Sequence, residues 1–525
     1  MSRLRSSVGP AALATLVALL AWGLAPVVYL VVESAASERS LSGADGPFAA
    51  DQLQYFAWIR SAGEHVLATN GFDLRAGGHV YLHPMWLLSG LAWRAGAGIA
   101  LSYLLWLPVA AGLLLAGFSA YVRRLVAPGR ARVATLVLAL FFVAPAHALF
   151  GWLGLPGASS VGLFAGELSP VLVLWGYLPI VIALGLMPLF LLGIERILEP
   201  SRRTAGRSAR WYLTWTAIAG ALASWLHPWQ GETLLVVVAG LLVWRRDWRS
   251  LPRLAVPLVA TLAPLVYYLA LAHWDSAWAI ARTQTNAPRP SLLFLALDLA
   301  PLALFAVAAP RRPGADVQER MLWLWPPATA IVYAISFTQG YGLHSVEGLS
   351  LPLGILAVRG WQRLNLPAGL AATAVLAATL PGLIFAAESE HRTIRSDQQP
   401  FLLRSDEVRA LAFLDRAPGD GGVLSSERLA AAVPAYTGRR TWQGHLTWTP
   451  DFPTRAAEVN DLFAGRLGSG AAQAFVRRVD AGFLLADCAE RRDLAPVLGP
   501  VVRTVHRFGC ASVYELAVPA LPALL

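Results

Sequence analysis

The chain has 525 residues, of which 56% are hydrophobic and 14% are charged, with a mean hydropathy of +0.53. Soluble domains carry about 25% charged residues, so this composition excludes a soluble protein and predicts a chain that crosses a membrane several times. The formal net charge is +10 and every basic residue is an arginine. The arginines lie between apolar segments, where they signal topology, so we expect no nucleic-acid partner.

The first apolar segment follows the basic start "MSRLR" and is longer than the 7–15 residues of a signal-peptide core. We therefore expect an uncleaved first span, and a cleaved signal ending near "SAAS" (34–37) is the alternative. A span requires about 20 apolar residues. On this basis we predict about eleven spans, near residues 11–32, 101–121, 133–150, 170–193, 211–227, 231–244, 254–272, 291–309, 321–337, 347–359 and 366–386.

Loops rich in arginine alternate with loops that are poor in it. The rich loops are 123–132, 195–210, 245–253, 311–320 and 359–366. The poor loops are 34–100, 151–169, 228–230, 273–290 and 338–346. Because positive charge stays on the cytoplasmic side, the alternation predicts a cytoplasmic N-terminus and an extracytoplasmic tail.

The tail differs in character from the rest of the chain. We predict two domains, a transmembrane domain at 1–386 that includes the first outer loop 34–100, and an α/β domain at 387–525. Apolar residues at helical spacing predict a helix at 404–417. Strands are expected at 421–426, 482–487, 501–508 and 511–518. Cys488 and Cys510 are a disulfide candidate in an oxidising compartment, and two unpaired cysteines are the alternative.

Ionisable groups at the outer ends of spans are candidates for a functional site, because such groups are costly at membrane depth. They include His83, Glu167, His227, Glu232, Asp275, Arg282, His344 and Glu347, and the uncharged polar residue Gln230 lies among them. Arg282 runs against the charge bias of its outer loop, so we expect it to contact phosphate. A single outer histidine is more often a hydrogen-bonded interfacial residue than a ligand. His227 and Glu232 lack the HExxH spacing, so we predict no structural metal.

The first outer loop contains the segment "AADQLQY" (49–55). Asp51 and Tyr55 are four residues apart, so they share one face of the expected helix. The apolar side predicts an amphipathic helix at the outer interface, and is formed by Phe56, Trp58 and Ile59. A carboxylate held there can act as a general base on an acceptor hydroxyl. The charge of a lipid-phosphate leaving group would need an arginine or a cation nearby.

This pattern resembles the GT-C superfamily of polytopic membrane glycosyltransferases, which use polyprenyl-phosphate-linked donors on the extracytoplasmic side. In that superfamily the first outer loop carries an acidic motif, commonly two adjacent acids followed by a tyrosine. Asp51 matches the first acid and Tyr55 the tyrosine, whereas Gln52 stands in the place of the second acid. The resemblance implies Asp51 as the general base. Gln52 removes one metal ligand, so dependence on Mg²⁺ or Mn²⁺ stays open, with Asp45 and Asp51 as candidate ligands.

The tail segment 431–465 resembles the extracytoplasmic domains of bacterial membrane proteins of this type. Aromatic and arginine side chains gather in it, namely Tyr436, Arg439, Arg440, Trp442, His445 and Trp448, together with the acid Asp451. Such a composition suits stacking on sugars and contacts to phosphate. An ordinary turn with surface aromatic residues is the alternative interpretation.

The expected fold is an α-helical polytopic membrane protein of GT-C type with a C-terminal extracytoplasmic α/β domain. The expected function is hexosyl or pentosyl transfer from a polyprenyl-phosphate donor to an envelope glycan, lipid or protein acceptor, at a bacterial plasma membrane. The expected substrate-binding residues are Gln52, Tyr55, His83, Glu167, His227, Gln230, Glu232, Arg282, His344, Tyr436, Arg439, Arg440 and His445. The alternatives are a secondary transporter or lipid-linked sugar flippase, although no internal repeat is visible, and a non-catalytic scaffold with a glycan-binding tail.

Overall fold

The structure is a computed structural model that describes residues 10–202, 206–283, 291–310, 316–339, 342–419, 421–490 and 492–517. The chain divides into two compact units. The first, called the helical unit, comprises Met1–Ala25, Leu105–Leu269 and Arg289–His391. The second, called the mixed unit, comprises Pro26–Leu104, Ala270–Pro288 and Arg392–Leu525. The first outer loop thus folds with the tail, although most of the helical unit lies between them in sequence.

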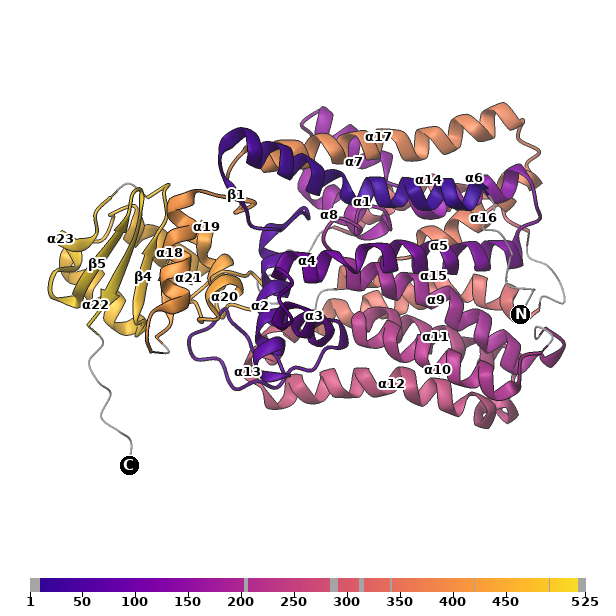
Figure 1. The fold of residues 1–525 in the computed structure, drawn as a ribbon. Helices are drawn as coiled ribbons and strands as arrows, with labels where there is room; N and C mark the ends of the chain where they lie inside the picture. Colours follow the sequence, from indigo (N-terminus) through magenta and orange to yellow (C-terminus); the bar gives the residue numbers. More distant parts are fainter. Residues whose placement is uncertain are drawn as a thin grey trace. The chain divides into compact units, whose positions relative to one another are not determined.

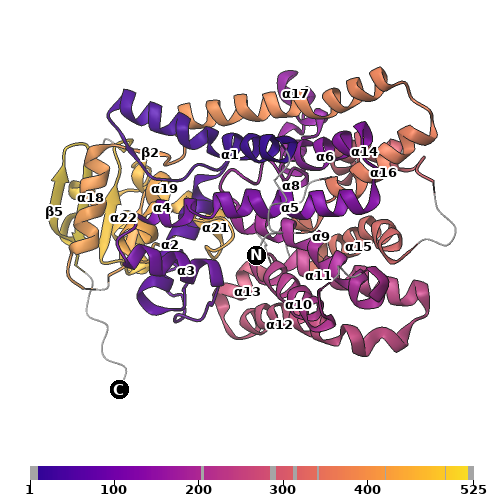
Figure 2. The ribbon, with the colours of Figure 1, turned by 45° about the vertical axis from the view of Figure 1, so that its right-hand side comes forward.

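The helical unit is built around α9 (Leu178–Leu198), which is apolar on all sides and therefore buried. Figures 1 and 2 show α9 side by side with α5 (Leu107–Leu125) and α10 (Ala209–Leu226). Gly117 and Gly185 allow the backbones of α5 and α9 to approach closely, because a Cβ at Gly117 would lie 2.0 Å from the Gly185 carbonyl oxygen.

The remaining helices of this unit pack around that centre. They are α6 (Arg130–Phe141), α7 (Pro145–Trp152), α8 (Ala158–Leu168), α11 (Pro228–Arg245), α14 (Leu292–Ala306), α15 (Val317–Gln339) and α16 (Ser350–Arg363), with the short turns η1 (Pro200–Arg202), η2 (Trp248–Ser250) and η3 (Gly342–Val346). Three long helices run from one unit into the other, namely α1 (Pro10–Ser37), α12 (Leu251–Trp274) and α17 (Ala368–Arg395).

Within the described residues, five helices are long and apolar enough to cross a membrane, and the pair α6 and α7, bent by 50°, would make a sixth. The five are Pro10–Ser37, Ile99–Leu125, Leu178–Leu198, Trp248–Trp274 and Ala368–Arg395. Each of the predicted spans falls on a helix or helix pair, several of them shorter than a full span. The chain is therefore a polytopic membrane protein that is mostly helical.

The start of the fourth predicted span was wrong. Residues 169–177 form turns, and α9 begins at Leu178 rather than near residue 170. Gly176 adopts a φ of +85°, which favours glycine, and Pro179 stands in the first turn of α9. A proline at that position fits a helix start, whereas hydropathy alone does not mark the break.

The mixed unit contains a four-stranded sheet in the order β3-β4-β6-β5. The strands are β3 (Val423–Ser425), β4 (Phe483–Ala486), β5 (Val502–Phe508) and β6 (Ala511–Leu516), and β3 and β4 are parallel while the other pairs are antiparallel. All four predicted strands are confirmed, as is the predicted helix, seen as α18 (Ser405–Arg416). The C-terminal α/β domain of the expected fold is therefore present.

Helices cover both faces of this sheet. One face packs on α21 (Phe452–Phe463) and α22 (Ser469–Val479), whose apolar residues surround Leu484 and Tyr514. On the other face, Phe413 of α18 contacts His506 of β5, with ring centroids 4.3 Å apart. The shorter helices of the tail are α19 (Glu427–Ala430), α20 (Ala432–Thr437), α23 (Ala495–Leu498) and η4 (Gly499–Val501).

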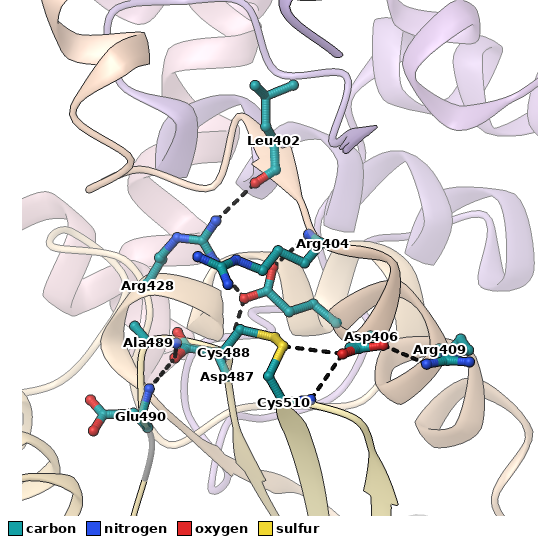
Figure 3. Close-up of a disulfide and its surroundings, with 11 residues drawn as sticks. Leu402, Arg404, Asp406, Arg409, Arg428, Asp487, Cys488, Ala489, Glu490 and Cys510 are labelled. Carbon is teal, nitrogen blue, oxygen red and sulfur yellow. Dashed lines mark hydrogen bonds and ion pairs between the residues drawn. A yellow bond between two sulfur atoms is a disulfide. The ribbon is translucent and has the colours of Figure 1, made fainter. Parts of the chain in front are cut away.

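Cys488 and Cys510 form a disulfide beside the sheet (Figure 3). Cys488 follows β4 and Cys510 precedes β6, which are neighbouring strands. The backbone N–H of Cys510 donates to Asp406, and that of Cys488 donates to Glu407, so both cysteines are tied to the start of α18. The bond therefore closes the end of the sheet at which α18 begins.

The first outer loop supplies the rest of the mixed unit. Its helices are α2 (Ala49–His65), α3 (Pro84–Arg94) and α4 (Ile99–Leu104), joined by α13 (Ser276–Thr283) from a later loop. A two-stranded sheet links this loop to the tail, because β1 (Ser40–Leu41) pairs antiparallel with β2 (Leu402–Leu403). The helix predicted around Asp51 is confirmed as α2.

Candidate functional site

Asp51 lies in the first turn of α2, where a carboxylate is favoured by the partial positive charge of the helix N-terminus. Phe48, which stands at the N-cap of α2, makes no side-chain hydrogen bond to the start of the helix. Gln399 of the tail takes over that task, because its Oε1 accepts from the Ala49 N–H at 2.6 Å and its Nε2 donates to the Pro47 carbonyl at 3.2 Å. The tail thus fixes the helix end that carries Asp51.

His445 of the tail faces Asp51. Its Nε2 lies 2.9 Å from Asp51 Oδ1. The Thr447 N–H donates to His445 Nδ1 at 3.1 Å, so Nδ1 is the acceptor and Nε2 carries the proton that is donated to Asp51. His445 is buried whereas the side chain of Asp51 is 32% exposed. The arrangement holds a partly exposed carboxylate in one orientation.

The side of α2 that bears Tyr55 packs on aromatic residues. Tyr55 stacks on Trp86 with ring centroids 4.8 Å apart, and His83 stacks on the same indole at 4.4 Å. On the apolar side of α2, Phe56 and Ile59 are fully buried within the protein, so the expectation that the apolar side lies at the lipid interface was wrong. Tertiary packing of the tail and the loop covers the apolar side.

His83 caps α3, since its Nδ1 accepts from the Trp86 N–H at 3.4 Å. Burial lowers the pKa of His83 to about 3, so the ring is neutral. Gln52 is also buried, and its Oε1 accepts from the Gly46 N–H at 2.7 Å while its Nε2 donates to Asp45. Both side chains therefore hold the local chain in this structure.

Asp45 and Asp51 were the candidate metal ligands of the first loop. Asp45 is 6% exposed, and burial raises the pKa of its carboxyl to about 6. Among the described residues, no group of three closely spaced metal-ligating side chains includes Asp45 or Asp51. The expectation that Asp45 and Asp51 bind a metal ion therefore stays a prediction.

Three tail residues predicted to bind substrate contact backbone carbonyls. Arg439 donates to the carbonyls of Leu414, Ala417, Gly419 and Gly421. Arg440 donates to the carbonyls of Ala76 and Gly77, both at 2.7 Å. Tyr436 donates to the Ser42 carbonyl, and burial raises its pKa. The contacts of Arg440 and Tyr436 join the first loop to the tail within the mixed unit, whereas those of Arg439 stay within the tail.

A cleft of about 110 Å³ opens at the C-terminal end of α2. It is lined mainly by polar side chains, namely Arg60, Ser61, Glu64, His65, Thr69, His79 and Arg440. The rings of His65 and His79 lie 3.9 Å apart. Burial, reinforced by the nearby His65, lowers the pKa of His79. Apart from Arg440, the sequence did not single out these residues, because loop 67–81 has no periodicity that would place them beside α2.

A second polar cluster lies in the helical unit, where several predicted outer residues meet. His227 Nδ1 is 3.3 Å from Glu347 Oε2, and His344 Nδ1 is 3.0 Å from Glu347 Oε1. Glu167, at the end of α8, contacts His344 Nδ1 at 3.0 Å. Gln230 Nε2 donates to Glu347 Oε2 at 2.6 Å. Sequence reasoning named these five residues as outer polar groups but left Glu347 out of the pocket.

Two further predicted residues lie outside these contacts. Glu232 is half-buried in the first turn of α11. Arg282 is exposed in the last turn of α13, in the mixed unit. The roles expected for these two residues stay predictions.

No protein-family model and no curated protein matches the sequence. Solved structures do resemble it. One is oligosaccharyltransferase AglB from Archaeoglobus fulgidus in complex with an inhibitory peptide and a dolichol-phosphate, with a TM-score of 0.51 and 13% identity over 93% of this chain and 71% of that one. Another is the apo form of the oligosaccharyltransferase from the same organism, with a TM-score of 0.51 and 12% identity over 99% and 76% of the two chains. At these identities the likeness is one of fold, and it confirms the GT-C-like fold that the sequence resemblance implied.

Proposed function

We propose that the protein is a membrane glycosyltransferase that moves a sugar from a polyprenyl-phosphate donor to an acceptor on the extracytoplasmic face. The shared fold with AglB supports this class, and the dolichol-phosphate in that complex supports a lipid-phosphate-linked donor. The peptide in the same complex makes a protein segment the first acceptor to test, ahead of an envelope glycan or lipid.

The observation that carries the proposal is the carboxylate of Asp51 in the first turn of α2, oriented by His445. In the proposed step, Asp51 takes the proton of the acceptor nucleophile while that nucleophile bonds to the anomeric carbon. The bond between the anomeric carbon and the phosphate oxygen breaks, and the lipid phosphate leaves with the electron pair. Asp51 thus orients and deprotonates the acceptor.

The test is sugar transfer by the full chain in nanodiscs. We would offer a panel of radiolabelled polyprenyl-phosphate sugars with peptide and envelope-glycan acceptors, and compare the wild type with Asp51→Asn. Asparagine can still accept from His445 but is not a base, so we expect the rate to fall by about 10²- to 10⁴-fold. Asp461→Asn is the matched control, because Asp461 is an exposed helical carboxylate paired with Arg466 in the same unit.

The two possible failures are separable. Transfer that survives in Asp51→Asn would overturn Asp51 as the base while it supports the class. Absence of transfer by the wild type from every donor and acceptor, with divalent cations supplied, would count against the class itself.

A further inference from the structure

We propose that the helical unit binds the headgroups of anionic phospholipids at the end where α10 begins, α11 ends and α12 begins. Five exposed arginines, called the arginine patch, gather there, namely Arg207, Arg210, Arg246, Arg249 and Arg253. This inference goes beyond the proposed function. The partner is a phospholipid of the bilayer rather than a sugar donor or an acceptor, and its binding would hold whatever reaction the protein performs.

The fold brings these arginines to one end of the helical unit. α10 and α11 contact each other along a hairpin that turns at His227, so the start of α10 and the end of α11 lie at the same end. The short segment 246–250 then leads from α11 to the start of α12. α12 packs on α10, because Ser224 Oγ donates to the Thr261 carbonyl at 2.7 Å. Figures 1 and 2 show the three helices side by side.

The link between α11 and α12 is a compact turn that leaves two arginines exposed. Arg246 adopts a left-handed φ of +51° and ends α11. Asp247 closes the turn, because Ser250 Oγ donates to its Oδ2 at 2.7 Å and the Ser250 N–H donates to its carbonyl at 3.2 Å. Its ion pair is with the half-buried Arg245 at 3.6 Å. The acid of this segment therefore holds the turn, while Arg246 and Arg249 remain exposed.

The arginine patch differs from other arginines of the helical unit in its lack of acidic partners. Arg124 pairs with Glu195 at 2.5 Å, and Arg359 pairs with Glu319 at 2.5 Å. Both of these acids are buried, so the protein itself neutralises these two arginines. Within the part of the chain that the structure describes, no arginine of the patch forms an ion pair with an aspartate or a glutamate. The positive charge of the patch is therefore available to an anion outside the protein.

The start of α10 adds to this positive potential. A helix N-terminus carries partial positive charge and favours acidic residues in its first turn. The N-cap of α10 is Ser208, which accepts from the Trp211 N–H at 3.1 Å, and Arg207 and Arg210 flank it. The first turn of α10 contains no acid. Two arginines at such a position are unfavourable by themselves, whereas a phosphate group would interact favourably with both of them and with the helix N-terminus.

Exposed tryptophans place the arginine patch at the depth of the lipid headgroups. Four tryptophans close to the patch in sequence are between 38% and 58% exposed, namely Trp211, Trp215, Trp244 and Trp248. The guanidinium of Arg207 lies 4.3 Å from the centroid of the Trp211 ring. Tryptophan is enriched at the level of the headgroups, so the arginines beside it lie at the level of the lipid phosphates. A guanidinium can donate two parallel hydrogen bonds to a phosphate, and this position favours a lipid over a soluble partner.

The predicted orientation of the chain agrees with this partner. The arginine patch belongs to the loops 195–210 and 245–253, which the alternation of arginine predicts to be cytoplasmic. Anionic lipids of the cytoplasmic leaflet attract basic segments at the membrane surface. The patch would therefore anchor this end of the helical unit in the cytoplasmic leaflet.

The test measures lipid binding to the full chain in a mild detergent by native mass spectrometry. The probe is phosphatidylglycerol, and phosphatidylcholine with the same acyl chains is the neutral comparison. We expect the wild type to bind phosphatidylglycerol about tenfold more tightly or better, with an affinity that falls as the salt concentration rises. Arg246→Gln with Arg249→Gln should weaken this binding by about 10- to 30-fold, because each arginine near an anionic surface contributes about a factor of five.

A second double variant, Arg207→Gln with Arg210→Gln, changes the other loop and should give a similar loss. Each double variant leaves other arginines in its loop, so the charge that signals topology is kept in part. Arg477→Gln with Arg503→Gln is the matched control. Both of these arginines are exposed in the tail, and the change removes the same charge, so binding should stay unchanged.

Equal binding of the two lipids by the wild type, or unchanged binding in both patch variants, would overturn the proposal. An equal loss in the tail variant would show a response to net charge alone and would also overturn it. Displacement of phosphatidylglycerol by an equal concentration of inorganic phosphate would overturn the lipid as the partner and indicate a site for a soluble anion. None of these measurements depends on sugar transfer, so this proposal and the proposed function fail separately.

Discussion

His83 and His227 each precede a proline that begins a helix, yet their side chains do different things. His83 Nδ1 accepts the Trp86 N–H and caps α3, whereas His227 Nδ1 faces Glu347. The sequence pairs "HPMW" and "HPWQ" look alike, so both residues were predicted to bind substrate. Only the neighbours that the fold brings to each ring separate a structural cap from a member of a polar cluster.

His445 should act through Asp51. Because its Nε2–H holds one carboxylate oxygen, His445→Ala frees Asp51 to rotate, and we expect kcat to fall by about 10²-fold with little change in the KM for the donor. His445→Gln should recover part of the loss, since the amide can donate from a similar position. His506→Ala, which removes a hydrogen bond with Glu515 on the sheet, is the control. An unchanged kcat in His445→Ala would refute the positioning role.

Asp45 should make stability depend on pH. Burial raises its folded-state pKa from 3.8 to about 6, so the folded state holds the proton more tightly than the unfolded state does. The contribution of Asp45 to the free energy of unfolding is therefore greatest below about pH 4. It falls by up to about 3 kcal/mol as the pH rises from about 4 to 6. Asp45→Asn removes the effect and should raise the apparent Tm at pH 7 relative to the wild type. A Tm difference that does not shrink on going from pH 7 to pH 5 would contradict this origin.

At the scale of elements, local pattern was a good guide. The four tail strands, the helix before them and α2 all formed where apolar periodicity and polar boundaries placed them. The predicted start of α9 was wrong, because the apolar segment first forms a turn at Gly176 and the helix begins only beside Pro179. The prediction that the apolar side of α2 lies at the lipid interface was also wrong, because aromatic residues of the loop and the tail cover it.

The disulfide should stabilise the end of the sheet beside α18. Cys488 and Cys510 are 22 residues apart, and closing a loop of this size contributes about 3 kcal/mol. Cys488→Ser with Cys510→Ser should therefore make the tail more sensitive to limited proteolysis in nanodiscs. Reduction of the wild type with dithiothreitol should give the same increase. Equal cleavage of the oxidised wild type and the double variant would show that the bond contributes nothing to the stability of the tail.

At the scale of the whole molecule, the two compact units regroup the chain. The first outer loop belongs with the tail, through β1 and β2 and through the contact of Asp51 with His445. Loop and tail must therefore lie on the same side of the membrane. This agrees with the arginine pattern, which places both outside.

The topology can be measured directly. A phosphatase reporter fused after residue 400 should be active, because the predicted location is extracytoplasmic, where such a reporter folds with its disulfides. The same reporter fused after Arg249, in an arginine-rich loop predicted to be cytoplasmic, should be inactive. The reverse pattern would overturn the predicted orientation and the donor side of the proposed reaction.

The sequence by itself determined that the chain is a polytopic membrane protein, where most helices and strands lie, and that polar residues gather at the outer ends of spans. These properties depend on hydropathy and periodicity, which are local along the chain. Only the tertiary structure decided that Asp51 meets His445 and that His227 meets Glu347. Those partners are far apart in sequence, and their contact depends on how whole helices and loops pack, which a local pattern does not encode.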